Sequence, residues 1–150
     1  MRPPTLPPVR SLSAEGLAEL KQHELCRLKA YPDRGGVWTI GWGDTIKVKE
    51  GDTCTQEQAD ARLVARLGEH ETALRKVLKR DPTQGQYDAF VSMSYNIGSA
   101  GLGTSTLLRL FNAGDTIGCA KQFARWVHVK GKVDEVLIQR RIDELCRYFS

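Results

Sequence analysis

Apolar residues recur every three or four positions over most of the chain, which is the spacing of one face of an α-helix. Four leucines between residues 63 and 78 follow this spacing and predict a helix over residues 55–79. Thr55 and Thr83 each begin a capping-box pattern and so favour helix starts at these points. The remaining periodicity, with its caps and breakers, predicts helices over residues 13–28, 83–95, 105–111, 115–127 and 135–149.

Residues 31–53 follow a different pattern. A Tyr-Pro-Asp-Arg-Gly-Gly turn at 31–36 precedes the β-favouring residues 37–42, and a second strand is expected at 46–48. We therefore predict a small antiparallel hairpin here. Together with the predicted helices, this hairpin indicates an α+β fold, in which a small N-terminal β-hairpin lobe precedes a larger C-terminal helical lobe. Glycines at 98, 101 and 103 are expected to interrupt the helical part.

The N-terminus is rich in proline. Four of the six prolines lie within residues 1–10, which predicts an extended arm rather than a helix. The remaining residues, 11–150, are expected to form one domain, because a chain of this length can bury one sizeable core.

Composition narrows the class of protein. With 41% hydrophobic and 27% charged residues, the chain resembles ordinary globular proteins and not disordered ones. The longest uncharged stretch, residues 89–108, is half Gly, Ser, Thr and Asn, so we expect no stable membrane insertion. The net charge of +4 suits a polyanionic partner, but no Lys/Arg cluster is dense enough to predict binding to a nucleic acid duplex.

Cysteine and histidine spacing predicts neither a metal site nor a cofactor. The cysteines at 26, 54, 119 and 146 include no C-x-x-C pair, and their disulfide pairing stays open. The histidines at 23, 70 and 128 have no H-E-x-x-H or similar spacing.

Glu24 is the first candidate for acid–base chemistry. Helical geometry places it on the apolar stripe of the first predicted helix, between Leu20 and Leu28. Burial disfavours an ionised carboxylate unless a cation compensates it, and a neutral carboxyl group is what a general acid requires. The alternative is an ordinary glutamate at the edge of a helix, paired with an arginine.

Asp33 and Thr39 follow within fifteen residues. Asp33 lies in the predicted turn, where a carboxylate is normally solvated and ionised, and Thr39 lies in the first predicted strand. Each residue alone is equally well explained by turn and strand preference. Together with Glu24 they predict two carboxyl groups in opposed environments, which is the arrangement that glycoside hydrolysis uses.

The pattern Glu24-x8-Asp33-x5-Thr39 resembles the catalytic signature of phage-type lysozymes, the T4-lysozyme-like endolysins of glycoside hydrolase family 24. Further blocks at 84–98, 105–115, 123–126, 131–133 and 140–141 are similar to that family and follow in its order. Two positions depart from it: Asp44 stands where a histidine is common, and Val136 where a glycine is usual.

The resemblance implies a lysozyme-like fold with the active site between its two lobes. It implies hydrolysis of the β-1,4 bond between N-acetylmuramic acid and N-acetylglucosamine in peptidoglycan, with inversion, for host cell lysis. Glu24 would be the general acid, and Asp33 and Thr39 would position the attacking water. A separate holin would release the protein from the host cytoplasm to the periplasm and cell wall, and we expect a monomer.

Four further residues are candidates for binding substrate. Arg140 or Arg141 is expected to balance the charge of Glu24, the alternative being a solvated helix face. Arg125 and Trp126 suit a saccharide groove, although Trp126 equally suits the core.

Two other functions stay open. A lytic transglycosylase would cut the same bond with one acid–base glutamate and would make Asp33 and Thr39 incidental. A non-catalytic wall-binding module would need none of the three residues.

Overall fold

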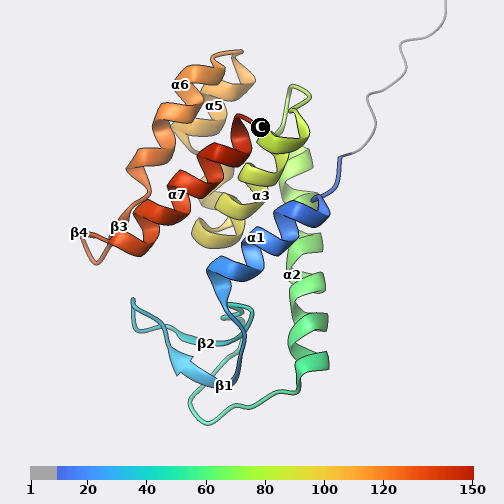
Figure 1. The fold of residues 1–150 in the computed structure, drawn as a ribbon, viewed down its shortest axis with the longest axis vertical. Helices are drawn as coiled ribbons and strands as arrows, with labels where there is room; N and C mark the ends of the chain where they lie inside the picture. Colours follow the sequence, from blue (N-terminus) through green and yellow to red (C-terminus); the bar gives the residue numbers. More distant parts are fainter. Residues whose placement is uncertain (1–9) are drawn as a thin grey trace, which may run out of the picture.

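Two unequal lobes, joined along one side by a long helix, make up the computed structural model, which describes residues 10–150 (Figure 1). The predicted proline-rich arm, residues 1–10, lies outside the described residues except for Arg10. The small lobe contains β1 (Arg27–Pro32) and β2 (Trp38–Gly41). The helices are α1 (Ala14–Glu24), α2 (Gln56–Val77), α3 (Gln84–Ile97), α4 (Ser99–Gly103), α5 (Thr106–Asn112), α6 (Thr116–Gln122) and α7 (Glu135–Tyr148).

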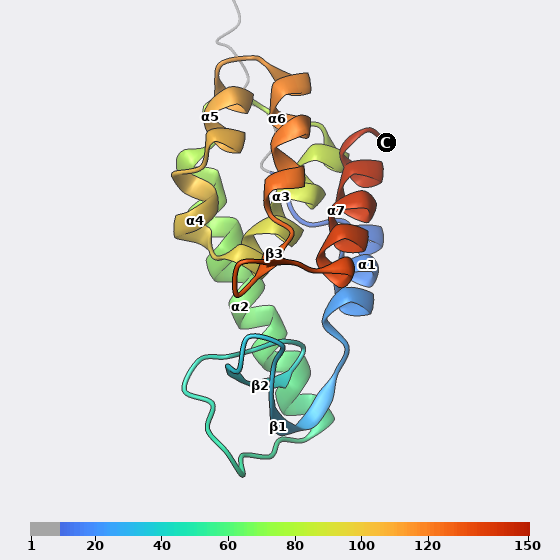
Figure 2. The same ribbon diagram turned by 90° about the vertical axis from the view of Figure 1, so that its left-hand side faces the viewer.

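Helix α3 forms the centre of the helical lobe. Every residue from Tyr87 to Ser94 is buried, because α1, α2 and α7 pack around it. In Figure 2, α5 and α6 lie at the end of this helix group that is farther from the hairpin. The Phe90 ring meets Phe111 and Tyr148 edge to face, with ring centroids 5.0 and 6.0 Å apart. This apolar core fixes the helices that border the space between the lobes.

Both predicted capping boxes are confirmed. The Thr55 hydroxyl accepts from the backbone N–H of Gln58, and the Gln58 side chain accepts from the N–H of Thr55. Thr83 and Gln86 make the same reciprocal pair at the start of α3. Such caps stabilise a helix by about 1 kcal/mol each, which explains why these two starts were predictable.

The prediction for residues 13–28 is wrong at its C-terminal end. Helix α1 ends at Glu24, because Leu25 adopts a left-handed backbone conformation with φ 49°. The chain then continues as β1. Glu24 is therefore the last residue of the helix and does not lie within a continuing apolar stripe.

One of the two predicted strands is confirmed, since residues 37–42 contain β2, but its partner is β1 and not residues 46–48. β1 pairs with β2 in antiparallel register, with Tyr31 opposite Thr39. Residues 46–48 contain a turn, with Lys47 at φ 56°, and form no strand. The other edge of β1 is bound by the segment before α2, where the Cys54 N–H donates to the Leu28 carbonyl at 2.8 Å.

Two further corrections concern the C-terminal half. The glycines at 98, 101 and 103 do not simply break the chain, since α4 forms there over Ser99–Gly103. The helix predicted to reach residue 127 ends at Gln122 and passes into a 3-10 turn, Phe123–Arg125. A short hairpin of β3 (His128–Val129) and β4 (Lys132–Val133) then leads into α7. The helices predicted at 105–111 and 135–149 are confirmed to within one residue at each end.

Candidate active site

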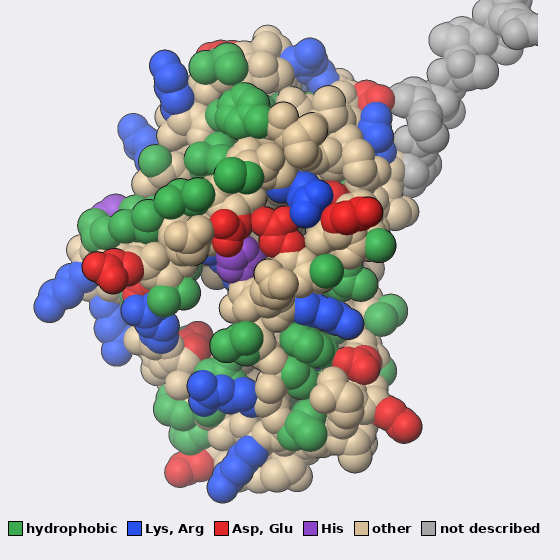
Figure 3. Space-filling view, in the orientation of Figure 1, with side chains coloured by type: hydrophobic (Ala, Val, Ile, Leu, Met, Phe, Trp, Pro, Cys, Tyr) green, Lys and Arg blue, Asp and Glu red, His purple; other side chains and the backbone are tan. Residues whose placement is uncertain are grey.

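A cleft of about 890 Å³ lies between the hairpin lobe and the helical lobe. Figure 3 shows the surface hollowed between the two lobes. The walls of the cleft include the end of α1, β1, the turn after β1 and the first turns of α7. A smaller pocket of about 370 Å³ shares Glu24, Tyr31 and Asp33 with it and contains Thr39. The three residues of the sequence signature therefore line one connected space.

Glu24 is held in the cleft by an arginine from the far end of the chain. Its side chain is 15% exposed, and its Oε1 accepts a hydrogen bond from Arg140 Nη1 at 2.5 Å. Arg140 is buried and also donates to the carbonyl of Ser92 at 3.1 Å. The predicted charge partner of Glu24 is therefore confirmed as Arg140, which places a fixed positive charge beside the carboxylate.

Arg141 has other partners than Glu24 and is not among the residues that line the cleft. It donates to the Asn96 side chain at 2.8 Å and to the Trp126 carbonyl at 3.1 Å. Its guanidinium also pairs with Glu144, from Nε to Oε1 at 2.5 Å. Burial lowers the pKa of Arg141 and raises the pKa of Glu144, so each ionised group depends on the other for compensation. Glu144 lies 3.9 Å from Arg140 as well, and so connects both arginines beneath the cleft.

Gly43 lies directly against the Glu24 carboxylate. A Cβ atom at this position would lie 2.1 Å from Glu24 Oε2, and the backbone has φ +83°, which favours glycine. No larger residue fits here unless the Glu24 carboxylate moves.

The substitution Gly43→Ala is expected to lower lytic activity by about tenfold or more, because the new methyl group displaces the Glu24 side chain. The matched control is Gly51→Ala, which has a similar φ of +87° but open space around its Cβ. Both variants carry the same backbone strain, so their melting temperatures should fall together. Equal activity in the two variants, measured by clearing of cells, would contradict a role for the position of Glu24.

Asp33 is oriented by its own turn. Its Oδ1 accepts from the backbone N–H groups of Gly35 and Val37, both at 2.8 Å. Its Oδ2 makes no hydrogen bond within residues 10–150, although the carboxylate lines the cleft. One oxygen therefore fixes the carboxylate and the other stays available to a water molecule or substrate.

Thr39 lies buried on β2, with 3% of its surface exposed. Its hydroxyl donates to the Val37 carbonyl at 2.8 Å, which leaves the oxygen able to accept, and Thr39 lines the smaller pocket together with Asp33. Its neighbour Ile40 is also buried, so both faces of β2 are covered.

Arg125 and Trp126 both line the cleft. Arg125 is exposed, whereas Trp126 is half-buried and also packs against the core of the helical lobe. Trp126 therefore lines the cleft and also packs in the core, and its contact with a saccharide stays a prediction.

Sequence reasoning missed several other lining residues, among them the polar side chains of Tyr31, Arg34 and Asn96. Arg34, from the hairpin lobe, donates to Asp134 Oδ1 at 2.7 Å and so connects the two sides of the cleft. The Arg34–Asp134 contact joins residues 100 positions apart, and no spacing in the sequence predicts it.

Asp44, the position that departs from the family pattern, has a structural partner. It is buried, and its Oδ2 accepts from Arg62 Nη1 at 2.8 Å. Its Oδ1 accepts from the backbone N–H of Ile46 at 3.1 Å. Asp44 thus fastens the loop after β2 to α2.

Comparison with solved structures defines the class first. The muramidase domain of SpmX from Asticaccaulis excentricus is 32% identical, with a TM-score of 0.83 over 94% of this chain and 99% of that one. An endolysin from Escherichia coli O157:H7 phage FAHEc1 is 38% identical, with a TM-score of 0.81 over 94% of each chain. The fold is therefore lysozyme-like, as predicted.

Sequence comparison then gives the family. The Phage lysozyme family matches residues 21–144. The endolysin of Acyrthosiphon pisum secondary endosymbiont phage 1 is 42% identical over 93% of this chain and 98% of that protein. The endolysin of Salmonella phage P22 is 35% identical over the same shares. The chain belongs to the phage lysozyme family, and it is a cell-wall-lysing glycosidase of the muramidase type.

Helices in residues 10–150 are all too short or too polar to cross a bilayer. Several relatives are SAR-endolysins, among them that of Enterobacteria phage P21, which is 36% identical over 74% of this chain and 68% of that protein.

Proposed function

We propose that this protein hydrolyses the β-1,4 bond between N-acetylmuramic acid and N-acetylglucosamine, with Glu24 as general acid and Asp33 and Thr39 positioning the attacking water. The observation that carries the proposal is the contrast between two carboxylates on one cleft. Glu24 is mostly buried and held by Arg140, whereas Asp33 keeps one oxygen free. Glycoside hydrolysis with inversion requires such a pair.

The hydrogen-bond geometry supports the assignment of roles. Arg140 fixes the Glu24 carboxyl group, so its proton can be delivered to the leaving glycosidic oxygen from one position. Asp33 Oδ2 takes one proton from the attacking water, while Thr39 Oγ1 accepts a hydrogen bond from the water's other O–H, which remains as the new anomeric hydroxyl. Water held by both groups attacks the face opposite the leaving group, and the anomeric carbon inverts.

Substrate binding is assigned to the exposed wall of the cleft. Arg125 offers hydrogen-bond donors to sugar hydroxyls and muramyl carboxylates, and Trp126 offers an aromatic face. The net charge of +4 complements an anionic wall polymer.

The setting is that of host cell lysis. The protein is held in the host cytoplasm, is released by a separate holin, and acts as a monomer on the peptidoglycan of the periplasm and wall. The endolysin relatives support this role.

The test is the substitution Asp33→Asn, which keeps the turn acceptor and removes the base. We expect at least about a 100-fold loss of wall hydrolysis. The products of the wild-type protein should carry reducing muramic ends. NMR should show that these ends are first released as the α anomer. The matched control is Asp52→Asn, which changes another turn aspartate that accepts from a backbone N–H.

Two outcomes would overturn the proposal. Anhydro-sugar products with full activity in Asp33→Asn would identify a lytic transglycosylase. Binding to purified wall without any soluble product would identify a wall-binding module.

A further inference from the structure

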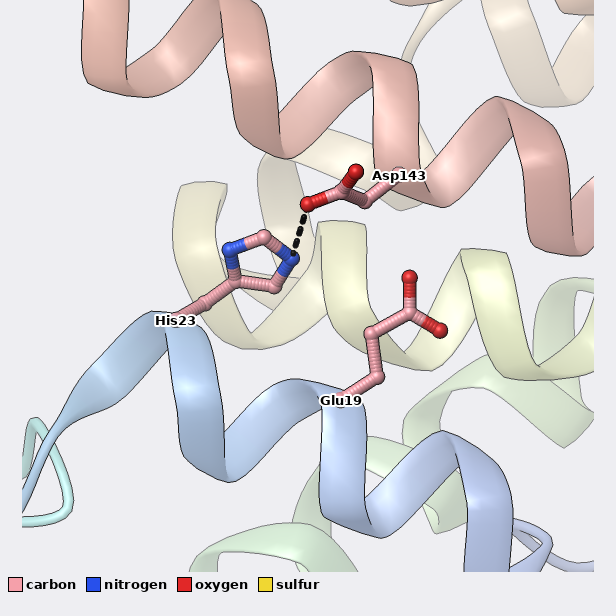
Figure 4. A group of neighbouring side chains, drawn as sticks. All are labelled: Glu19, His23 and Asp143. Atoms are coloured by element: carbon pink, nitrogen blue, oxygen red, sulfur yellow. Dashed lines mark ion pairs between the residues drawn. The ribbon is translucent and has the colours of Figure 1, made fainter.

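A second cluster of ionisable side chains lies where α1 packs beside α7. Glu19 and His23 stand four residues apart on α1, and Asp143 reaches them from α7 (Figure 4). One ligand atom from each residue lies within 4.8 Å of the other two. This cluster adjoins the cleft, because His23 directly precedes Glu24 and lines the cleft, whereas Glu19 and Asp143 are not among the lining residues.

The His23 ring is the unusual member. Its side chain is 13% exposed, and its Nε2 is shut off from solvent without a hydrogen-bond partner in the part of the chain that the structure describes. Figure 4 shows this nitrogen directed toward Asp143, whose Oδ2 lies 3.5 Å away, too far for an ordinary hydrogen bond. A buried ring nitrogen with an unused lone pair or proton is costly unless something completes it.

We propose that Glu19, His23 and Asp143 bind a divalent transition-metal ion, best matched by zinc, which bridges α1 and α7. One imidazole nitrogen and two carboxylates form a set of three protein ligands that leaves a fourth position to water. The nitrogen ligand favours zinc over calcium or magnesium, which prefer oxygen alone.

The geometry requires a small contraction. Tetrahedral ligands about 2.1 Å from zinc lie about 3.4 Å from one another, so the ligand atoms, now within 4.8 Å, must approach by up to about 1.4 Å. Glu19 and Asp143 have side chains that are 24% and 37% exposed, and both can change rotamer without disturbing the core.

Arg147 competes with the metal. Its Nη2 and Nε donate to Glu19 Oε2 at 2.9 and 3.0 Å, and this surface pair must open before Glu19 can bind an ion. A partly exposed pair of this kind contributes little to stability, so it limits the affinity without preventing binding.

Histidine spacing predicted no such site because Glu19-x-x-x-His23 contains only one histidine and the third ligand is 120 positions away from His23. The i, i+4 spacing on one helix face was the available signal. An ion at this place would fasten the two helices that carry Glu24 and Arg140.

The experiment is a titration of the EDTA-treated, reduced full-length protein with zinc chloride. Binding is measured by calorimetry, and the melting temperature is measured by thermal unfolding. We expect one site, and a rise in melting temperature of about 5 °C at a hundredfold excess over the dissociation constant. Asp143→Asn and Glu19→Gln should each weaken binding at least about tenfold. Arg147→Gln should strengthen it several-fold, because it releases Glu19.

Two controls make the assignment specific. His128→Gln changes an exposed histidine outside the cluster and should leave the affinity unchanged. The double variant Cys26→Ser with Cys54→Ser removes two free thiols that are neighbours in the hairpin lobe and should also leave it unchanged. Binding that survives Asp143→Asn, that is lost with the thiols, or that raises no melting temperature would overturn the proposal.

Discussion

Glu24→Gln is expected to lower wall lysis by at least about 100-fold while leaving the fold intact. The glutamine keeps an oxygen that accepts from Arg140, so the interaction at 2.5 Å is weakened but not abolished. It has no proton to deliver to the glycosidic oxygen. The measurement is clearing of outer-membrane-stripped Gram-negative cells, with the melting temperature taken on the same preparation.

The control for this variant is Glu15→Gln, an exposed carboxylate on the same helix. It changes the net charge equally and should clear cells at the wild-type rate. Activity of Glu24→Gln within tenfold of wild type would show that Glu24 is not the acid, whatever its place in the cleft.

Glu144→Gln is expected to have the largest effect on stability. It removes the only carboxylate among the described residues that contacts both Arg140 and Arg141, and so leaves buried positive charge uncompensated. Removing one partner of a buried ion pair costs about 3–5 kcal/mol, which for a chain of this size lowers the melting temperature by about 10 °C. Thermal and urea unfolding measure the loss.

The matched control is Glu19→Gln, measured without added metal. It breaks the Arg147 pair, which is of the same chemical type but is partly exposed, and it should cost less than about 1 kcal/mol. Equal losses in the two variants would contradict the importance of burial. The loss in Glu144→Gln should also reduce activity, because Arg140 is less firmly placed against Glu24.

Local signals in the sequence were sufficient for most of the helical lobe. Thr55 and Thr83 identified helix starts because a capping box involves only four consecutive residues. The Glu24–Asp33–Thr39 signature found the cleft for a similar reason, since all three residues belong to one helix–hairpin segment. The sequence left Arg140 and Arg141 as alternative partners of Glu24, and only the structure decides for Arg140.

The failures occurred where tertiary contacts outweigh local preference. Residues 27–32 carry alternating basic side chains that fit a helix end, but pairing on both edges makes them the central strand of the small lobe. Helix α1 ends where Leu25 adopts a positive φ, and a leucine in the sequence does not predict such a conformation. α4 forms despite its glycines because Leu102 is buried in the core of the helical lobe. The Arg34–Asp134 contact depends on how the two lobes meet, which periodicity does not describe.

The hydrogen bond between Glu24 and Arg140 joins residues 116 positions apart, and this separation has a consequence for synthesis. A ribosome completes α1 and the hairpin long before it reaches α7. Until then the acid has no guanidinium beside it, and Arg141 and Glu144 are not yet present to complete the support beneath the cleft. A nascent chain, or one stopped by a nonsense mutation before residue 135, therefore carries the Glu–Asp–Thr signature without Arg140, and we expect it to lack lytic activity.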